Sequence, residues 1–108
     1  MKLLLDENLP KKLKAVFGSG HEVYTVGDMN WNGTKNGALL GLMVMNNFEG
    51  FVTIDKKLQH QQNLEKFPIL LAIFDAPSNK VEILKPYVEK LLEMLNEEDL
   101  GNLMVVSI

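Results

Sequence analysis

The chain contains, near its start, the run Leu3-Leu4-Leu5-Asp6-Glu7-Asn8, in which three apolar residues are followed at once by two acids and an amide. The apolar part is too continuous for a strand with one face in water, so we expect residues 2–5 to form a buried strand of a parallel sheet. A second run of this kind, Phe51-Val52-Thr53-Ile54-Asp55, predicts a strand over 51–54. Each predicted strand therefore leads into a carboxylate.

Strand-like and helix-like segments alternate along the whole chain, which is typical of an α/β domain with a mostly parallel sheet. Further strands are expected over 21–26, 69–74 and 103–108. Apolar spacing predicts a helix after Asn8, which is placed to cap it, and a largely apolar helix over 35–46. We therefore expect a three-layer α/β/α sandwich around a mostly parallel sheet of about five strands, built as a single domain over residues 1–108.

The second half of the chain contains three less regular segments. Residues 56–66 are polar and predict a short exposed helix or a loop. Pro86 is expected as the first residue of the last helix, because an interior proline costs about 3 kcal/mol. Residues 79–85 would then form a separate helical turn, with Asn79 and Glu82 at the spacing of a capping box.

Composition narrows the classes of function. The chain has 108 residues, a net charge of −3 and no cysteine, which excludes disulfides, thiolate metal sites and thiol chemistry. All 11 basic residues are lysines, so phosphate contacts would come from point charges and not from a bidentate guanidinium. No apolar run approaches the roughly 20 residues of a membrane span. We expect a soluble cytoplasmic protein with no membrane partner.

Asp6 and Asp55 are the strongest candidates for a functional site. Ligands in open α/β sheets gather outside the carboxyl ends of the strands, where these two carboxylates would converge. A pair of carboxylates can hold a hard divalent ion such as Mg²⁺, which keeps several of its waters. The alternatives are a first-turn helix charge for Asp6 and a turn-forming side chain for Asp55.

Weaker candidates surround this pair. Thr53 alternates with Asp55 along the strand, so both side chains point to one side of its end. Glu7 and Asn8 are auxiliary candidates, although Glu7 could face solvent and Asn8 could simply cap a helix. Asp75 also follows an apolar strand, but the turn sequence after it favours a turn role.

Several lysines and aromatic or imidazole groups have two interpretations. The lysines near the site are either contacts for an RNA phosphate backbone or members of a solvated face: Lys11, Lys12, Lys14, Lys56 and Lys57. Trp31, within a polar loop, either stacks on a base or plugs the core. His21 and His60 have no partner at metal-ligand or triad spacing, so no chemistry is assigned to them.

With these residues placed, the chain resembles the small PIN-like proteins, relatives of the VapC-type toxin ribonucleases, over nearly its whole length. The resemblance rests on Leu-Leu-Asp-Glu-Asn-Leu-Pro at 4–10, on Gly-His-Glu-Val at 20–23 and on Val-Thr-Ile-Asp-Lys at 52–56. An apolar fourth strand before a closing helix completes it. The opening motif is the most specific part.

The resemblance implies an α/β/α sandwich that cuts RNA with Mg²⁺ or Mn²⁺ held by three or four carboxylates. Asp6 would be the first metal ligand and Asp55 the later one, and the products would be a 5′-phosphate and a 3′-hydroxyl. The chain departs from this pattern in two places, where Lys35-Asn36-Gly37 and Lys57-Leu58 stand in place of acidic residues. Asn36 could supply a neutral oxygen ligand but not the missing charge, so a non-catalytic domain is an alternative.

Two further functions compete with the nuclease. A phosphoacceptor receiver also places an acidic pair after strand one and an aspartate after strand three, but this chain has Asp75-Ala76 and no lysine in 103–108 where receivers carry a hydroxyl residue and a lysine. The third hypothesis is a binding module, either held by a small antitoxin-like protein or self-associating as a homodimer through the Met-rich helix over 35–46.

Overall fold

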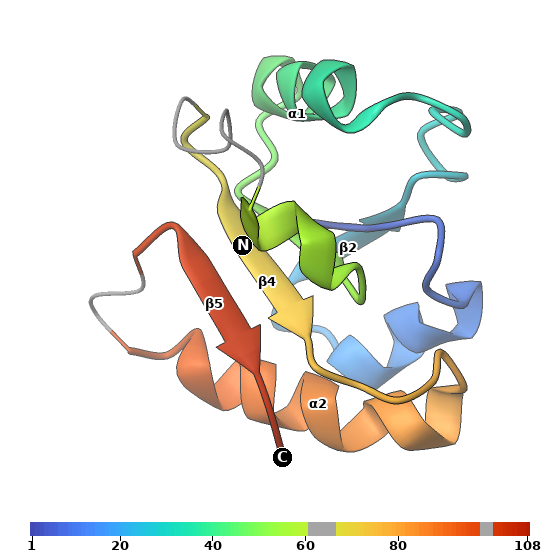
Figure 1. The fold of residues 1–108 in the computed structure, drawn as a ribbon, viewed down its shortest axis with the longest axis vertical. Helices are drawn as coiled ribbons and strands as arrows, with labels where there is room; N and C mark the ends of the chain where they lie inside the picture. Colours follow the sequence, from blue (N-terminus) through green and yellow to red (C-terminus); the bar gives the residue numbers. More distant parts are fainter. Residues whose placement is uncertain (61–66, 98–100) are drawn as a thin grey trace.

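A parallel sheet forms the centre of the structure, a computed structural model that describes residues 1–60, 67–97 and 101–108 (Figure 1). Within these residues the sheet has five strands in the order β2-β1-β3-β4-β5, and every pairing is parallel. The strands are β1 (Lys2–Leu5), β2 (Glu22–Thr25), β3 (Gly50–Thr53), β4 (Leu70–Phe74) and β5 (Leu103–Val106). The expected sheet is confirmed, and β3 begins and ends one residue earlier than predicted.

Helices lie on both faces of the sheet, consistent with the expected α/β sandwich. They are the 3₁₀ helices η1 (Lys11–Phe17) and η2 (Lys56–His60) and the α-helices α1 (Asn36–Met45) and α2 (Val81–Met94). In the described parts of the chain, no helix has both the length and the apolar character needed to cross a bilayer.

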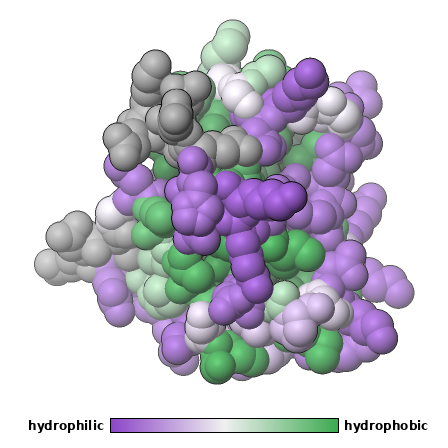
Figure 2. Space-filling view, viewed as in Figure 1, coloured by the Kyte–Doolittle hydropathy of each residue, from purple (hydrophilic) through white to green (hydrophobic). Residues whose placement is uncertain are grey.

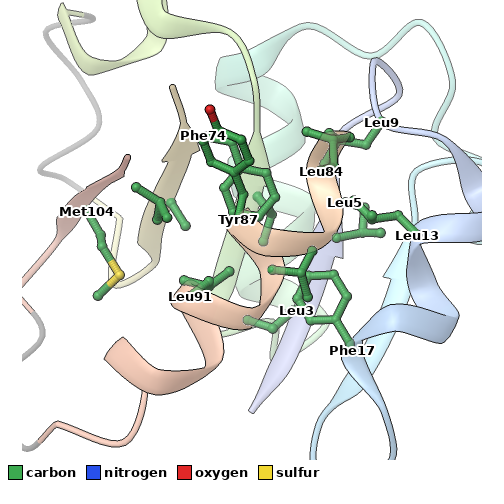
Figure 3. Close-up of a cluster of buried hydrophobic side chains, with 14 of the residues drawn as sticks. Leu3, Leu5, Leu9, Leu13, Phe17, Phe74, Leu84, Tyr87, Leu91 and Met104 are labelled. Atoms are coloured by element: carbon green, nitrogen blue, oxygen red, sulfur yellow. The ribbon is translucent and has the colours of Figure 1, made fainter. Parts of the chain in front are cut away.

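The two faces of the sheet bury separate hydrophobic clusters. On one face, Leu3 and Leu5 of β1 pack with side chains of η1 and α2 (Figure 3). On the other face, Leu4 packs with side chains of α1 and η2, including Met43 and Leu58. Both sides of the central strands are thus buried, which explains why these strands read as continuous apolar runs.

The outer strand β5 is covered less completely. Met104 and Val106 face the cluster beneath α2, whereas Leu103 and Val105 point to the opposite face and are 45% and 44% exposed. Figure 2 shows hydrophobic side chains in the area of this strand, next to hydrophilic side chains near the centre of the view. The second cluster therefore stops short of the edge of the sheet.

The strand order places β1 and β3 side by side, with β2 on one flank and β4 and β5 on the other. This order is that of flavodoxin-like doubly wound folds, whose ligands bind at the switch point between the first and third strands. Leu5 pairs with Val52, and the N–H of Asp6 donates to the carbonyl of Val52 at 2.9 Å. The residues after the two strands consequently meet at one edge of the sheet.

The prediction of a helix that begins directly after Asn8 and is capped by it is wrong. Pro10 is the residue that precedes η1, its backbone is extended, and no side chain caps the helix. Proline disfavours the helical conformation for the residue before it, so Leu9 cannot begin a helix. Asn8 is left two residues upstream, with its side chain directed to β3 instead.

The separate turn over 79–85 and the start at Pro86 are also wrong, because α2 is one continuous helix from Val81 with Pro86 inside it. Lys80 precedes the helix and no side-chain cap forms, so the capping box is absent. Pro86 is exposed and removes one hydrogen bond, but the buried side chains on both sides of it keep the helix on the sheet. They are Leu84, Tyr87, Val88 and Leu91.

Two other segments bear on the predictions. The segment over 56–66 begins as η2 and buries Leu58, while residues 61–66 lie outside the described parts of the structure. The apolar helix over 35–46 is observed as α1, in which Leu39, Leu40 and Met43 are buried. Met45 is 79% exposed, so core packing accounts for part of this Met-rich segment only.

Replacing Pro86 with alanine tests the continuous helix. Pro86→Ala restores an N–H for the Glu82 carbonyl, worth about 3 kcal/mol in helix propensity, while the unfolded chain gains about 1 kcal/mol of entropy. We expect the free energy of unfolding in urea to rise by about 2 kcal/mol. A fall in stability would mean that the helix begins at Pro86.

Candidate functional site

The hydroxyl of Thr53 lies at the centre of the edge where β1 and β3 end. Its Oγ1 donates to Oδ2 of Asp6 at 2.7 Å and accepts from the backbone N–H of Asp55 at 3.0 Å. It also accepts from Nδ2 of Asn8 at 3.3 Å. Thr53 itself is 0% exposed. One buried hydroxyl therefore joins three of the predicted site residues.

Asp6 is held at both carboxylate oxygens. The N–H of Glu7 donates to Oδ1 at 2.8 Å, opposite the hydrogen bond from Thr53. Burial raises the pKa of Asp6, the hydrogen bonds from Thr53 and Glu7 oppose that rise, and the charges of Glu7 and Asp55 add to it. The carboxylates of Asp6 and Asp55 thus lie near enough to repel each other.

Asp55 makes the local hydrogen bond of a turn-forming aspartate. Its Oδ1 accepts from the N–H of Lys57 at 3.0 Å, a local bond that shapes the turn into η2. Its backbone N–H is bound to Thr53, which fixes the residue at the site edge. The structure therefore joins the backbone of Asp55 to Thr53 and uses its carboxylate in the turn into η2.

Asn8 has one oxygen that lacks a partner. The single hydroxyl hydrogen of Thr53 is given to Asp6, so Thr53 can only accept from Asn8, and the amide nitrogen must face it. This leaves Oδ1 of Asn8 buried with no hydrogen-bond partner among the described residues. A buried acceptor left unpaired costs about 1–3 kcal/mol, so a hydrogen-bond donor or a cation that reached this oxygen would be stabilised there.

These groups fit a hydrated divalent cation. Two carboxylates and a neutral amide oxygen are hard ligands of the kind that Mg²⁺ and Mn²⁺ take, and Mg²⁺ keeps several waters. Within the described parts of the chain, no group of three or more His, Cys, Asp or Glu side chains could enclose a metal. Any cation held at this edge would therefore depend on water for most of its ligands.

Two auxiliary candidates lie outside this network. Oε1 of Glu7 accepts from the N–H of Gly33 at 3.1 Å, which ties the loop after β2 to the site edge. Gly33 has φ 79°, a conformation that glycine adopts without strain. Asn36 is the first residue of α1, and none of the side-chain hydrogen bonds in the described residues joins it to Thr53.

Most of the candidate lysines are paired with acids. Nζ of Lys56 lies 2.5 Å from Asp75, and the nitrogens of Lys11 and Lys14 lie 3.9 Å and 2.6 Å from Asp28. Lys57 contributes its backbone N–H to Asp55. Lys12 takes part in no ion pair among the described residues and lines a surface hollow.

Three structural contacts were missed from the sequence. The hydrogen bond from Lys14 and the N–H of Thr25 hold the pKa of Asp28 down to about 2 at the turn after β2. Nδ2 of Asn79 donates to the carbonyl of Asn8 at 3.2 Å, from 71 residues away. The contacts of Lys14 with Asp28 and of Asn79 with Asn8 follow from tertiary proximity and leave no local signal, whereas the Thr25–Asp28 bond lies within one turn.

Trp31 and Asp75 both make contacts that stabilise the fold. The Trp31 ring lies 5.8 Å from that of Phe48 in an edge-to-face arrangement and packs on the second cluster, as a core plug would. The carbonyl of Asp75 accepts from the Tyr87 hydroxyl at 2.9 Å, which anchors the turn after β4 to α2. His21 lies 3.2 Å from the terminal amine of Met1.

The fold and the site together define an α/β protein with a five-stranded parallel sheet, in which Asp6, Thr53 and Asp55 lie where β1 and β3 end. No protein-family model, no curated protein and no solved structure matches the chain. The assignment of function consequently depends on the residues at this edge.

Asp6→Asn tests the electrostatics of this edge. Because the pKa of Asp6 is raised on folding, the native state binds its proton more tightly than the unfolded state does. The contribution of Asp6 to stability is therefore full below the ordinary value of 3.8 and is lost as pH rises from there through the folded pKa. We expect Asp6→Asn to remove part of this fall in urea unfolding measured across a pH series.

The control is Glu82→Gln, which removes one exposed carboxylate from α2. It should leave the pH profile close to that of the native chain. An Asp6→Asn profile that also parallels the native one would contradict a buried, proton-retaining carboxyl at residue 6.

Proposed function

We propose that this chain is a PIN-like, divalent-metal-dependent ribonuclease in which Asp6 and Asp55 hold Mg²⁺ or Mn²⁺. The observation that carries the proposal is the Thr53 hydroxyl, which joins Asp6, Asp55 and Asn8 at the ends of β1 and β3. These residues belong to the two motifs, at 4–10 and 52–56, on which the family resemblance rests.

Each residue has a defined part in this chemistry. Bound divalent metal supplies an activated water and neutralises charge that develops on a phosphate. The N–H of Glu7 and the hydroxyl of Thr53 orient the two oxygens of Asp6, so the carboxylate is preorganised. Asn8 contributes a neutral oxygen without further charge repulsion. RNA is the substrate class that the resemblance implies.

The small number of acids favours a second candidate of reduced activity. Among the described residues, no third acidic side chain joins Asp6 and Asp55 in a group that could hold a metal, in keeping with Lys35-Asn36-Gly37 and Lys57-Leu58 in the sequence. Such a site binds cations more weakly than one with three or four carboxylates. The alternative is therefore a catalytically inactive PIN-like module that acts through a protein partner, such as a small antitoxin-like protein or a second copy of the chain.

The strand order favours a further alternative, the phosphoacceptor receiver. The order β2-β1-β3-β4-β5 is shared with receiver domains, with Asp55 after the third strand. Against it, Asp75 follows β4 and pairs with Lys56, and residues 103–108 contain no lysine. Incubation with a small phosphodonor distinguishes the two, because a labile aspartyl phosphate on Asp55 would overturn the nuclease proposal.

RNA cleavage with Mg²⁺ or Mn²⁺ tests the nuclease directly. We expect Asp6→Asn and Asp55→Asn each to lower the cleavage rate more than about 100-fold. Loss of a group that only supports a metal ligand costs up to about 100-fold, and loss of a ligand itself should cost more. Thr53→Val should lower it about 10–100-fold, because the valine keeps the shape but loses the hydroxyl. Thr53→Ser should restore most of the rate.

Asp75→Asn is the matched control, since this carboxylate also follows a strand but pairs with Lys56. Its rate should match that of the native chain. Metal-dependent cleavage that survives both Asp6→Asn and Asp55→Asn would reject the site. Equal inactivity of every variant and of the native chain would favour the binding module.

The free oxygen of Asn8 gives a test that is independent of activity. Asn8→Ala should weaken Mn²⁺ binding in calorimetry, and Asn8→Asp should strengthen it by adding a third charge. In the absence of metal, Asn8→Asp should lower the melting temperature because another carboxylate is buried beside Asp6. Mn²⁺ affinity unchanged in both variants would remove Asn8 from the ligand set.

A further inference from the structure

A hollow of about 510 Å³ lies between η1 and α2, outside the site described above. Figure 1 shows η1 running alongside the first half of α2, and Figure 3 shows Leu13 and Phe17 of η1 and Leu84 of α2 among the side chains of one buried cluster. Six residues line it, Lys12, Ala15 and Val16 from η1 and Val81, Lys85 and Glu89 from α2. None of these residues has a part in the cation site.

The hollow begins next to the candidate site. Lys12 stands at the start of η1, which follows β1, and Val81 is the first residue of α2, which follows β4. The turn before α2 is bonded to the site loop, because Nδ2 of Asn79 donates to the carbonyl of Asn8 at 3.2 Å. From this end the hollow runs away from the sheet edge toward Glu89.

Its charge is positive at the end near the site. In the described residues, Lys11 and Lys14 form ion pairs with Asp28, and Lys56 forms one with Asp75. Neither Lys12 nor Lys85 is within ion-pair distance of a described acid. Both side chains are exposed and come from different helices, so they lie on opposite walls. The walls also carry Val16 and Val81, which offer apolar surface between the two ammonium groups.

We propose that this hollow receives a single strand of RNA as it leaves the site, with backbone phosphates at Lys12 and Lys85. The proposal rests on the proposed function and adds the path of the substrate. Ammonium groups contact phosphates as point charges, so the path is independent of base sequence. Riboses and base faces lie against Val16 and Val81. Glu89 repels a polyanion and sets the far end of the path.

The test is fluorescence anisotropy with a short, fluorescein-labelled single-stranded RNA in EDTA, so that no metal-dependent cleavage competes. The double variant Lys12→Ala/Lys85→Ala should bind more weakly, and the slope of log K against log salt should shrink by about 1.4, or about 0.7 for each lost phosphate contact. Glu89→Gln should bind more tightly. Lys90→Ala removes an exposed lysine of α2 that does not line the hollow, and should bind like the native chain.

The outcomes separate this path from the nuclease proposal. If the double variant binds RNA as the native chain does, or if the native chain binds none, the path is overturned, whatever the cleavage assay shows. If RNA binding depends on both lysines but no metal-dependent cleavage is found, the path stands and the nuclease proposal fails. If poly-glutamate binds through the lysines and RNA does not, the hollow is a site for an acidic protein segment and the RNA proposal is overturned.

Discussion

The hydroxyl of Thr53 is the group on which the arrangement of the site depends. It has one hydrogen, which goes to Asp6, and its lone pairs accept from Asp55 and Asn8. Because Thr53 is fully buried, water has little access to the hydroxyl end of each bond, which strengthens it. The same bonds fix the direction of the Asn8 amide and leave its oxygen free. One side chain thereby orients a charged ligand, a turn and a neutral oxygen.

This interaction exists because of the way the sheet is wound. Adjacent parallel strands end at the same edge, and β1 and β3 are neighbours although the whole of β2 and α1 lies between them in the sequence. Burial of both faces by separate hydrophobic clusters fixes the register, since a slip of one residue would move Leu4 and its neighbours to the wrong face. The burial that stabilises the sheet also raises the pKa of Asp6.

Much of this could be predicted from the sequence where local pattern and topology act together. The strands were predictable because continuous apolar runs such as Leu3-Leu4-Leu5 suit a sheet buried on both faces. The positions of Asp6 and Asp55 after β1 and β3 were predictable because the two strands are read from their apolar runs, and adjacent parallel strands end at one edge. What sequence reasoning could not supply was the partner of each polar group. Asn8 is of a residue type that caps helices, but the helix begins after Pro10. The Asn8 amide donates to the Thr53 hydroxyl instead. Pro86 has the signature of a helix start, but buried side chains on both sides of it outweigh the lost hydrogen bond.

Paramagnetic NMR with Mn²⁺ tests the central claim, that one cation is shared by the ends of β1 and β3, most directly. A substoichiometric amount of Mn²⁺ added to ¹⁵N-labelled protein should broaden the amide signals of residues 6–8 and 53–57 before any others. Broadening that spares either of these two segments, or that begins elsewhere on the chain, would show that Asp6 and Asp55 do not bind a common ion.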